Sequence, residues 1–166
     1  MVAARRSMVA WVLAVVALAL LVGACGGGVD KGAYERGMRG VGAQISKASS
    51  ATAGLSADAT NAQRVTAIRM QAAAIGNAAD QAAALAPPAD ASKAHKQLVS
   101  ALKDYAVLLG DLADASNDTA QQSKLLGRAG AIVDRLKTSS TSLEKAGYSF
   151  GIDRAKATTK TTGSDS

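Results

Sequence analysis

Cysteine, histidine and aromatic residues are scarce in this chain of 166 residues, which has one cysteine, one histidine, one tryptophan, three tyrosines and one phenylalanine. A single cysteine excludes an intramolecular disulfide, a thiolate metal cluster and a two-cysteine redox motif. A single histidine, His95, excludes a helical-bundle metal site built on two Glu-x-x-His pairs. The two glutamates, Glu35 and Glu144, lie off the apolar stripes described below, so no buried acid–base pair is expected. We therefore predict no enzyme activity, no metal and no cofactor.

Charge is not concentrated in one sign either. The formal net charge is +6, and the basic residues are interspersed with acidic ones. A nucleic-acid-binding surface usually combines a dense basic cluster with stacking aromatic side chains, and neither occurs here. We therefore predict that nucleic acid is not a partner. Arg154, Lys156 and Lys160, near the C-terminus, are the best candidates for a weak attraction to an anionic lipid or polymer.

One long hydrophobic run is present, and it lies at the N-terminus. Arg5 and Arg6 precede 15 uninterrupted apolar residues, from Met8 to Val22, and the small residues Gly23 and Ala24 follow. This order of a basic, an apolar and a small-residue region is typical of a secretory signal peptide. The alternative is an uncleaved signal anchor, although a membrane-spanning helix needs about 20 apolar residues. Both interpretations place the rest of the chain outside the cytoplasm, because the arginines stay inside.

The sequence Val22-Gly23-Ala24-Cys25 resembles the lipobox of bacterial lipoproteins. The resemblance implies that diacylglycerol is attached to the Cys25 sulfur and that the chain is cleaved before Cys25. Residues 1–24 would then be the signal peptide, and residues 25–29, with three glycines, a flexible tether. Each buried methylene contributes about 0.8 kcal/mol, so two or more acyl chains give a stable anchor. We therefore predict a lipid-anchored protein at the outer, extracytoplasmic face of the cell membrane.

From Asp30 onward, the apolar residues recur with a helical period of three and four residues, and no alternating run predicts a strand. Four such stripes predict four helices. They are Tyr34, Met38, Val41, Ile45, Ala48, Thr52 and Leu55; then Val65, Ile68, Ala72, Ile75, Ala79 and Ala82; then Ala91, Ala94 or His95, Leu98, Leu102, Tyr105, Leu109 and Leu112; and finally Leu125, Ala129, Ile132, Leu136, Ser139, Leu143 and Ala146.

Start and stop signals separate the stripes. Thr60 with Gln63, and Thr119 with Gln122, fit the capping box at a helix start. Pro87-Pro88 should end the second helix, Asp90 should cap the third, and Gly147 should end the fourth. Helices of this length with short links favour an all-α, antiparallel, up-down-up-down four-helix bundle over residues 30–152, with alanine-rich seams. Residues 153–166 are polar and basic, and we predict a disordered tail.

Two isolated features have a functional and a structural interpretation. Gly147-Tyr148-Ser149-Phe150-Gly151 matches the Gly-x-Ser-x-Gly nucleophile elbow, but the elbow needs a preceding strand and a later histidine, and here a helix precedes and His95 lies upstream. We predict instead a helix stop with Tyr148 and Phe150 covering one end of the bundle. His95 lies between Lys93 and Lys96, and we expect it at the edge of its stripe near the helix start.

The segment Leu85-Ala86-Pro87-Pro88 followed by His95, Leu98, Leu102 and Tyr105, together with the Cys-Gly-Gly-Gly start, resembles helical-bundle lipoproteins of high-GC Gram-positive bacteria. This resemblance implies a fold and a location, not an activity. We expect a non-enzymatic interaction module that binds another envelope protein or polymer. The alternative is a bundle that binds a small apolar ligand or lipid. Such a ligand needs a cavity of about 300 Å³ or more, whose expected lining is Met38, Met70, Ile75 and Leu109.

Overall fold

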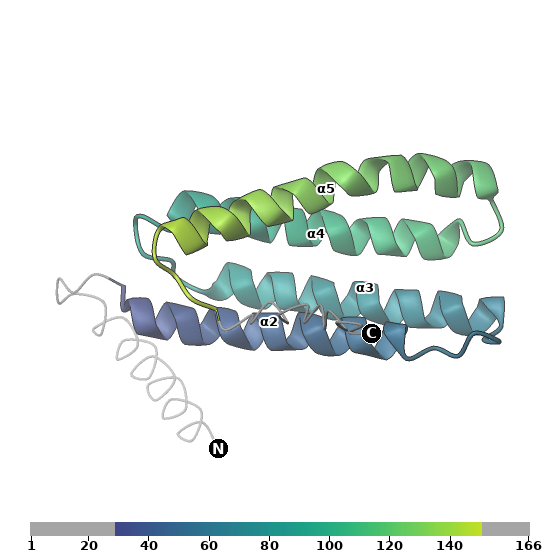
Figure 1. The fold of residues 1–166 in the computed structure, drawn as a ribbon, viewed down its shortest axis with the longest axis horizontal. Helices are drawn as coiled ribbons and strands as arrows, with labels where there is room; N and C mark the ends of the chain where they lie inside the picture. Colours follow the sequence, from purple (N-terminus) through teal and green to yellow (C-terminus); the bar gives the residue numbers. More distant parts are fainter. Residues whose placement is uncertain (1–28, 151–166) are drawn as a thin grey trace, which may run out of the picture.

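The computed structural model describes residues 29–150, which form four helices in one elongated bundle (Figure 1). The helices are α2 (Lys31–Ala53), α3 (Asn61–Ala84), α4 (Ser92–Asp114) and α5 (Thr119–Lys145). The predicted all-α four-helix bundle is confirmed. The predicted signal peptide, the lipobox residues Val22, Gly23 and Ala24, the anchor Cys25 and the tail 153–166 lie outside the described residues.

Most of the predicted helix ends are found. At the start of α3, Thr60 and Gln63 form the predicted capping box, in which each side chain bonds to the other residue's backbone. The α5 helix ends at Gly147, whose φ of 84° is the left-handed conformation that glycine tolerates best. The amides of Gly147 and Tyr148 donate to the carbonyls of Glu144 and Leu143, which is the Schellman pattern of a helix C-terminus.

Two predicted caps were wrong. Asp118, and not Thr119, caps α5, because its carboxylate accepts from the Gln121 amide at 2.9 Å. Asp90 does not cap α4, which begins after Ala91 without any side-chain cap. The Asp90 carboxylate instead accepts a hydrogen bond from the Tyr148 hydroxyl at 2.5 Å. A tertiary partner 58 residues away therefore prevails over a local capping bond.

Consecutive helices run in opposite directions, as the colours along the chain show in Figure 1. Side-chain pairs between neighbouring helices give the same result, because the residue number rises in one helix as it falls in the next. The pairs are Gln44–Gln81 and Thr52–Gln71 between α2 and α3, Lys103–Asp80 and Arg69–Asp114 between α3 and α4, and Arg135–Asp104 and Arg128–Asp111 between α4 and α5.

The four helices do not approach one another equally closely. The α2 helix packs against α3, α3 against α4, and α4 against α5, but the backbones of α2 and α5 do not come into contact within the described residues. Residues 147–150, which follow α5, turn back toward α2 in Figure 1. We call residues 147–150 the clasp, and the end of the bundle where they lie the clasp end. The opposite end, which contains the links 54–60 and 115–118, is called the far end.

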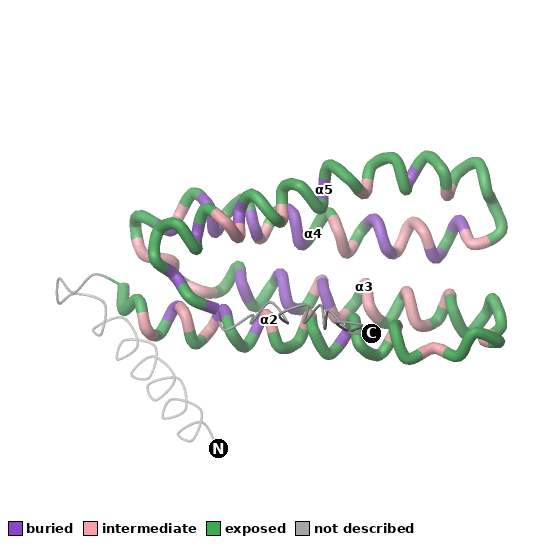
Figure 2. The backbone as a smooth tube through the Cα atoms, viewed as in Figure 1, coloured by how far each residue is buried: buried purple, intermediate pink, exposed green. Residues whose placement is uncertain are grey.

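The main core joins all four helices and the clasp, and Figure 2 shows that burial is greatest toward the clasp end. On α3 the buried residues are Ile75, Ala78, Ala79 and Ala82, so the alanine-rich seam is confirmed in this helix. Leu98, Leu102 and Leu109 of α4 belong to the same core. Because the side chains on α3 are small, the larger leucines of α4 can pack between them and the two helices can approach closely.

A smaller cluster lies toward the far end between α4 and α5, and it contains Leu108, Ala115, Leu125 and Ile132. Four large apolar side chains within the helices are exposed: Met70, Val107, Leu126 and Val133. Met70 and Leu126 lie near Arg69 and Arg128, which pair with Asp114 and Asp111 in the last turns of α4. Val107 lies in the second half of α4 and Val133 near the middle of α5, whereas Val29, just before α2, is exposed at the clasp end. Within the helices, the far half therefore buries less and exposes more of the large apolar side chains.

Candidate functional site

His95 and Tyr34 form a buried polar pair at the clasp end. His95 lies near the start of α4, as predicted, but its ring is buried, with 4% of its surface exposed, and not at the edge of the stripe. The Tyr34 hydroxyl lies 2.9 Å from His95 Nδ1. The two rings meet edge to face at a centroid distance of 5.5 Å. This pair links the first turns of α2 and α4, which are 61 residues apart in the chain.

The surroundings keep both groups neutral near pH 7. Burial lowers the pKa of His95, and a hydrogen bond to the Ala82 backbone partly opposes that effect. Burial, and then the nearby Tyr148, raise the pKa of Tyr34 to about 12. A neutral imidazole has one ring nitrogen that accepts and one that donates. The Tyr34 hydroxyl therefore donates to Nδ1, and the other ring nitrogen carries the hydrogen.

The clasp covers this pair with two aromatic rings. Tyr148 and Phe150 pack edge to face on the Tyr34 ring at centroid distances of 5.5 and 6.1 Å. Both residues are buried, which confirms the prediction that they cover one end of the bundle. The Lys31 ammonium lies 5.0 Å from the Tyr148 ring centre, within the range of a cation–π contact. Tyr34 thus contacts both His95 and the clasp.

Polar contacts hold the clasp backbone on α2. The Ser149 amide donates to Glu35 at 3.0 Å, and its carbonyl accepts from Arg39 at 3.4 Å. The hydrogen bond to Asp90 raises the pKa of Tyr148 to about 12, with a smaller effect of burial, so its hydroxyl stays protonated. Helix α5, and not a strand, precedes Ser149, so the nucleophile-elbow geometry is not formed here.

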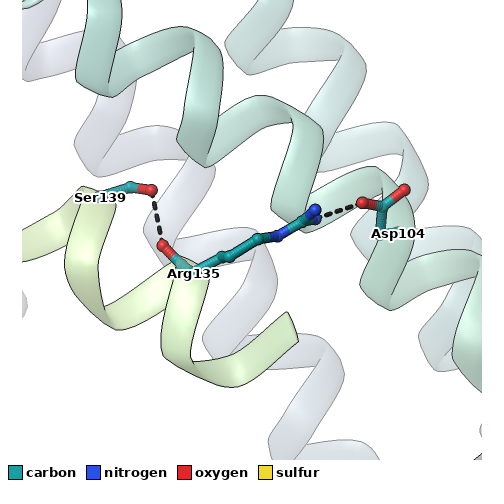
Figure 3. A network of polar contacts seen from close by, with 3 residues as sticks. All are labelled: Asp104, Arg135 and Ser139. Carbon is teal, nitrogen blue, oxygen red and sulfur yellow. Dashed lines mark hydrogen bonds and ion pairs between the residues drawn. The ribbon is translucent and has the colours of Figure 1, made fainter. Parts of the chain in front are cut away.

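A groove of about 400 Å³ lies between α4 and α5, and two of the side chains that line it, Arg135 and Ser139, have partners within the chain. In Figure 3, the Arg135 side chain extends from α5 to Asp104 on α4 and forms an ion pair, while the Ser139 hydroxyl donates to the Arg135 carbonyl at 2.6 Å. Ser139 is buried, as its stripe position predicts. The arrangement stabilises the α4–α5 seam and gives no nucleophile–base pair.

A second groove, of about 500 Å³, lies between α2 and α3. Ala48, Ala51, Ala67, Ala74 and Met70 line it, together with a rim of glutamines, Asn77, Thr52 and Lys47. The predicted lining of a single apolar cavity was wrong, because Met38, Ile75 and Leu109 are buried in the core whereas Met70 is 68% exposed. The space beside Met38, between α2, α4, α5 and the clasp, measures only about 70 Å³.

Sequence reasoning did not predict the Tyr34–His95 and Tyr148–Asp90 pairs. Tyr34 and His95 occupy stripe positions near the starts of the first and third predicted helices. Both starts lie at the same end of an antiparallel bundle, so the predicted topology already placed Tyr34 and His95 at the same end. Between residues 29 and 150, no three His, Cys, Asp or Glu side chains are grouped as metal ligands. Over the same residues, no helix is both long and apolar enough to span a bilayer.

Comparisons of the chain with protein-family models, with curated proteins and with solved structures found no match.

Proposed function

We propose that this chain is a lipoprotein held at the outer face of the cell membrane by lipid on Cys25, and that its bundle is a non-enzymatic module that binds another envelope protein or polymer. The sequence Val22-Gly23-Ala24-Cys25 supports the anchor. Asp30 caps α2 only five residues after Cys25. A chain that short spans at most about 18 Å, so the clasp end would lie close to the membrane.

The observation that carries the binding proposal is the position of the exposed apolar side chains. Met70, Val107, Leu126 and Val133 are between 49% and 68% exposed, and they lie in the middle and far parts of the bundle. With the anchor at the clasp end, these side chains would be the ones accessible to a partner. Leu126 and Val133 are two turns apart on the same face of α5, and neighbouring exposed apolar groups, rather than single ones, mark interaction surfaces. Anchoring also raises the local concentration, so weak contacts suffice.

Site-specific photo-cross-linking in intact cells tests this proposal. A photoreactive residue at Val133 or Met70 should give discrete adducts, whereas one at Lys93 or Ala33, which are also exposed but lie at the clasp end, should give few. Replacing Cys25 with Ala should abolish the adducts, because the protein would no longer be concentrated at the membrane. Equal adduct formation at both ends, or adducts that persist without Cys25, would contradict the proposal.

A second candidate is favoured by the α2–α3 groove, whose volume of about 500 Å³ fits a small apolar ligand. Its floor consists mainly of alanines, and Met70 can adapt to different shapes. An environment-sensitive fluorescent fatty acid should bind the wild-type protein and not the Ala74→Trp variant, which fills the groove. Ala84→Trp, at an exposed site outside the groove, is the matched control. Equal binding by both variants would reject this candidate.

A further inference from the structure

The clasp is connected to His95 through a single side chain. Tyr34 bonds to His95 through its hydroxyl, and its ring carries the edge-to-face contacts of Tyr148 and Phe150. Any change that moves the Tyr34 ring therefore disturbs the surface on which the clasp packs. The proposed function uses none of these residues.

The Tyr34 hydroxyl can donate to His95 Nδ1 only while the imidazole is neutral. In the described residues, every buried polar side-chain atom has a hydrogen-bond partner. A proton added at Nδ1 would put an N–H and an O–H hydrogen into the same 2.9 Å gap. The Tyr34 hydroxyl hydrogen must then turn away from the ring and loses its acceptor. A buried donor without an acceptor costs about 1–3 kcal/mol.

The charged groups around the clasp end do not compensate a buried imidazolium. Three nearby carboxylates have other partners, since Glu35 accepts from the Ser149 amide, Asp90 from the Tyr148 hydroxyl, and Asp104 from Arg135. Among the described ion pairs, His95 has none. The remaining charged side chains of the surrounding elements include three that are also paired or bonded, namely Asp30 with Arg36, Asp80 of α3 with Lys103, and Arg39 with the Ser149 carbonyl. These elements also carry Lys31 on α2, Lys93 and Lys96 on α4, and Glu144 and Lys145 at the end of α5. Most of these are cations, which oppose a second positive charge.

Water can nevertheless supply the proton. His95 is one of the residues that line a groove of about 460 Å³ between α3 and α4, whose other walls include Leu85, Lys96 and Val99. The ring is thus enclosed on the side of Tyr34 and borders the groove on another side. Protonation does not require prior unfolding of the bundle.

We propose that the Tyr34–His95 pair makes the clasp an acid-sensitive latch, which is closed while His95 is neutral and opens when His95 takes up a proton. Opening separates Tyr148 and Phe150 from Tyr34 and exposes this aromatic surface next to the start of α2. Helices α3 and α4 stay packed, because their alanine–leucine seam contains no titratable group that changes charge with His95.

The sign of the pH dependence follows from the direction of the pKa shift. Burial places the pKa of His95 in the closed state below 6.5, and an open clasp returns it toward 6.5. Above pH 6.5 the ring is neutral in both states, so pH has no effect. As the pH falls below 6.5, the open state binds the proton more tightly. The ratio of closed to open molecules then falls by up to about tenfold for each pH unit that separates the two pKa values.

Hydrogen exchange of the full chain at pH 7.5 and pH 5.0, corrected for the intrinsic pH effect, tests the latch. The Ser149 amide, which donates to Glu35 on α2, should lose protection at pH 5.0, by up to about tenfold for each pH unit that separates the two pKa values. Amides in the middle of α3, around Ile75, should not change between the two pH values. The His95→Gln variant keeps a neutral polar side chain, and its clasp should be protected equally at both pH values.

Three results would overturn the proposal. The first is unchanged protection of the Ser149 amide in the wild-type chain, and the second is an equal loss of protection in His95→Gln. The third needs no variant: the His95 pKa can be read from its ring ¹³C–¹H NMR signal in the wild-type protein, and a value at or above 6.5 would exclude an acid-opened latch. Failure of the latch would leave the anchor and the partner surface untouched, because those tests use other residues.

Discussion

The two ends of the bundle are built differently. At the clasp end, side chains from α2, α4, the link before α4 and the segment after α5 meet in one buried aromatic and polar cluster. At the far end, the Arg69–Asp114 ion pair and the Asn61–Asn117 hydrogen bond are exposed, and the separate core is small. Exposed ion pairs contribute little stability. The comparison suggests that the clasp end holds the fold together while the far end is free to present its surface.

The largest expected effect comes from a matched pair of leucines on α5. Leu143 and Leu125 are five turns apart on the same face, and both are buried, but Leu143 packs in the main core and Leu125 in the small cluster. We expect Leu143→Ala to lower the free energy of unfolding by about 4 kcal/mol and Leu125→Ala by about 2 kcal/mol, because a loosely enclosed cavity can relax. Urea denaturation measures both, and equal losses would remove the contrast between the ends.

A smaller effect is expected from the clasp hydroxyl. Tyr148→Phe removes the hydrogen bond to Asp90 while keeping the ring contacts, and it should cost about 1–2 kcal/mol because the acceptor is a carboxylate. Tyr105→Phe is the control, since Tyr105 is half-buried on α4 and none of the hydrogen bonds described above involves its hydroxyl. If thermal unfolding shows the same shift for both variants, the Tyr148–Asp90 bond does not secure the clasp.

The capping box of α3 should matter at the level of about 1 kcal/mol. Thr60→Ala removes the acceptor for the Gln63 amide at the far end of the bundle. Since this end is expected to open locally, hydrogen exchange near Asn61 should rise more than the global stability falls. A uniform rise across all four helices would instead mean that the far end unfolds only with the rest.

The smallest effect is expected for a surface ion pair. Arg69→Met keeps the aliphatic stem and removes the pairing with Asp114, which lies at 2.8 Å but is largely exposed. We expect a change in the free energy of unfolding of about 0.5 kcal/mol or less, decreasing further in high salt. A loss of several times that value would show that the far end depends on charge pairing.

The sequence was sufficient to predict the helices and most of their buried faces, because the spacing of the apolar residues indicates which side of each helix is buried. All four stripes face the core, although Ala146, at the end of the last one, is exposed. The spacing of apolar residues within one helix does not indicate how closely that helix approaches another. The full burial of Ala101 and Leu108, and the wider separation of the α2 and α5 backbones, therefore appear only in the structure.

The details of the clasp end could not be predicted for a related reason. Asp90 has a local use as a helix cap and a distant use as the acceptor for Tyr148, and a single sequence does not say which one prevails. His95 was expected at a stripe edge because two lysines flank it. Those lysines remain exposed while the ring between them turns inward, so neighbours in the sequence were a poor guide to burial.

The central claim, that lipid on Cys25 holds the clasp end near a membrane, is tested most directly by mass spectrometry of the native protein purified from cell membranes. We expect the chain to begin at Cys25 and to carry the mass of diacylglycerol on its sulfur. A chain that retains its first 24 residues and has an unmodified thiol would contradict the account.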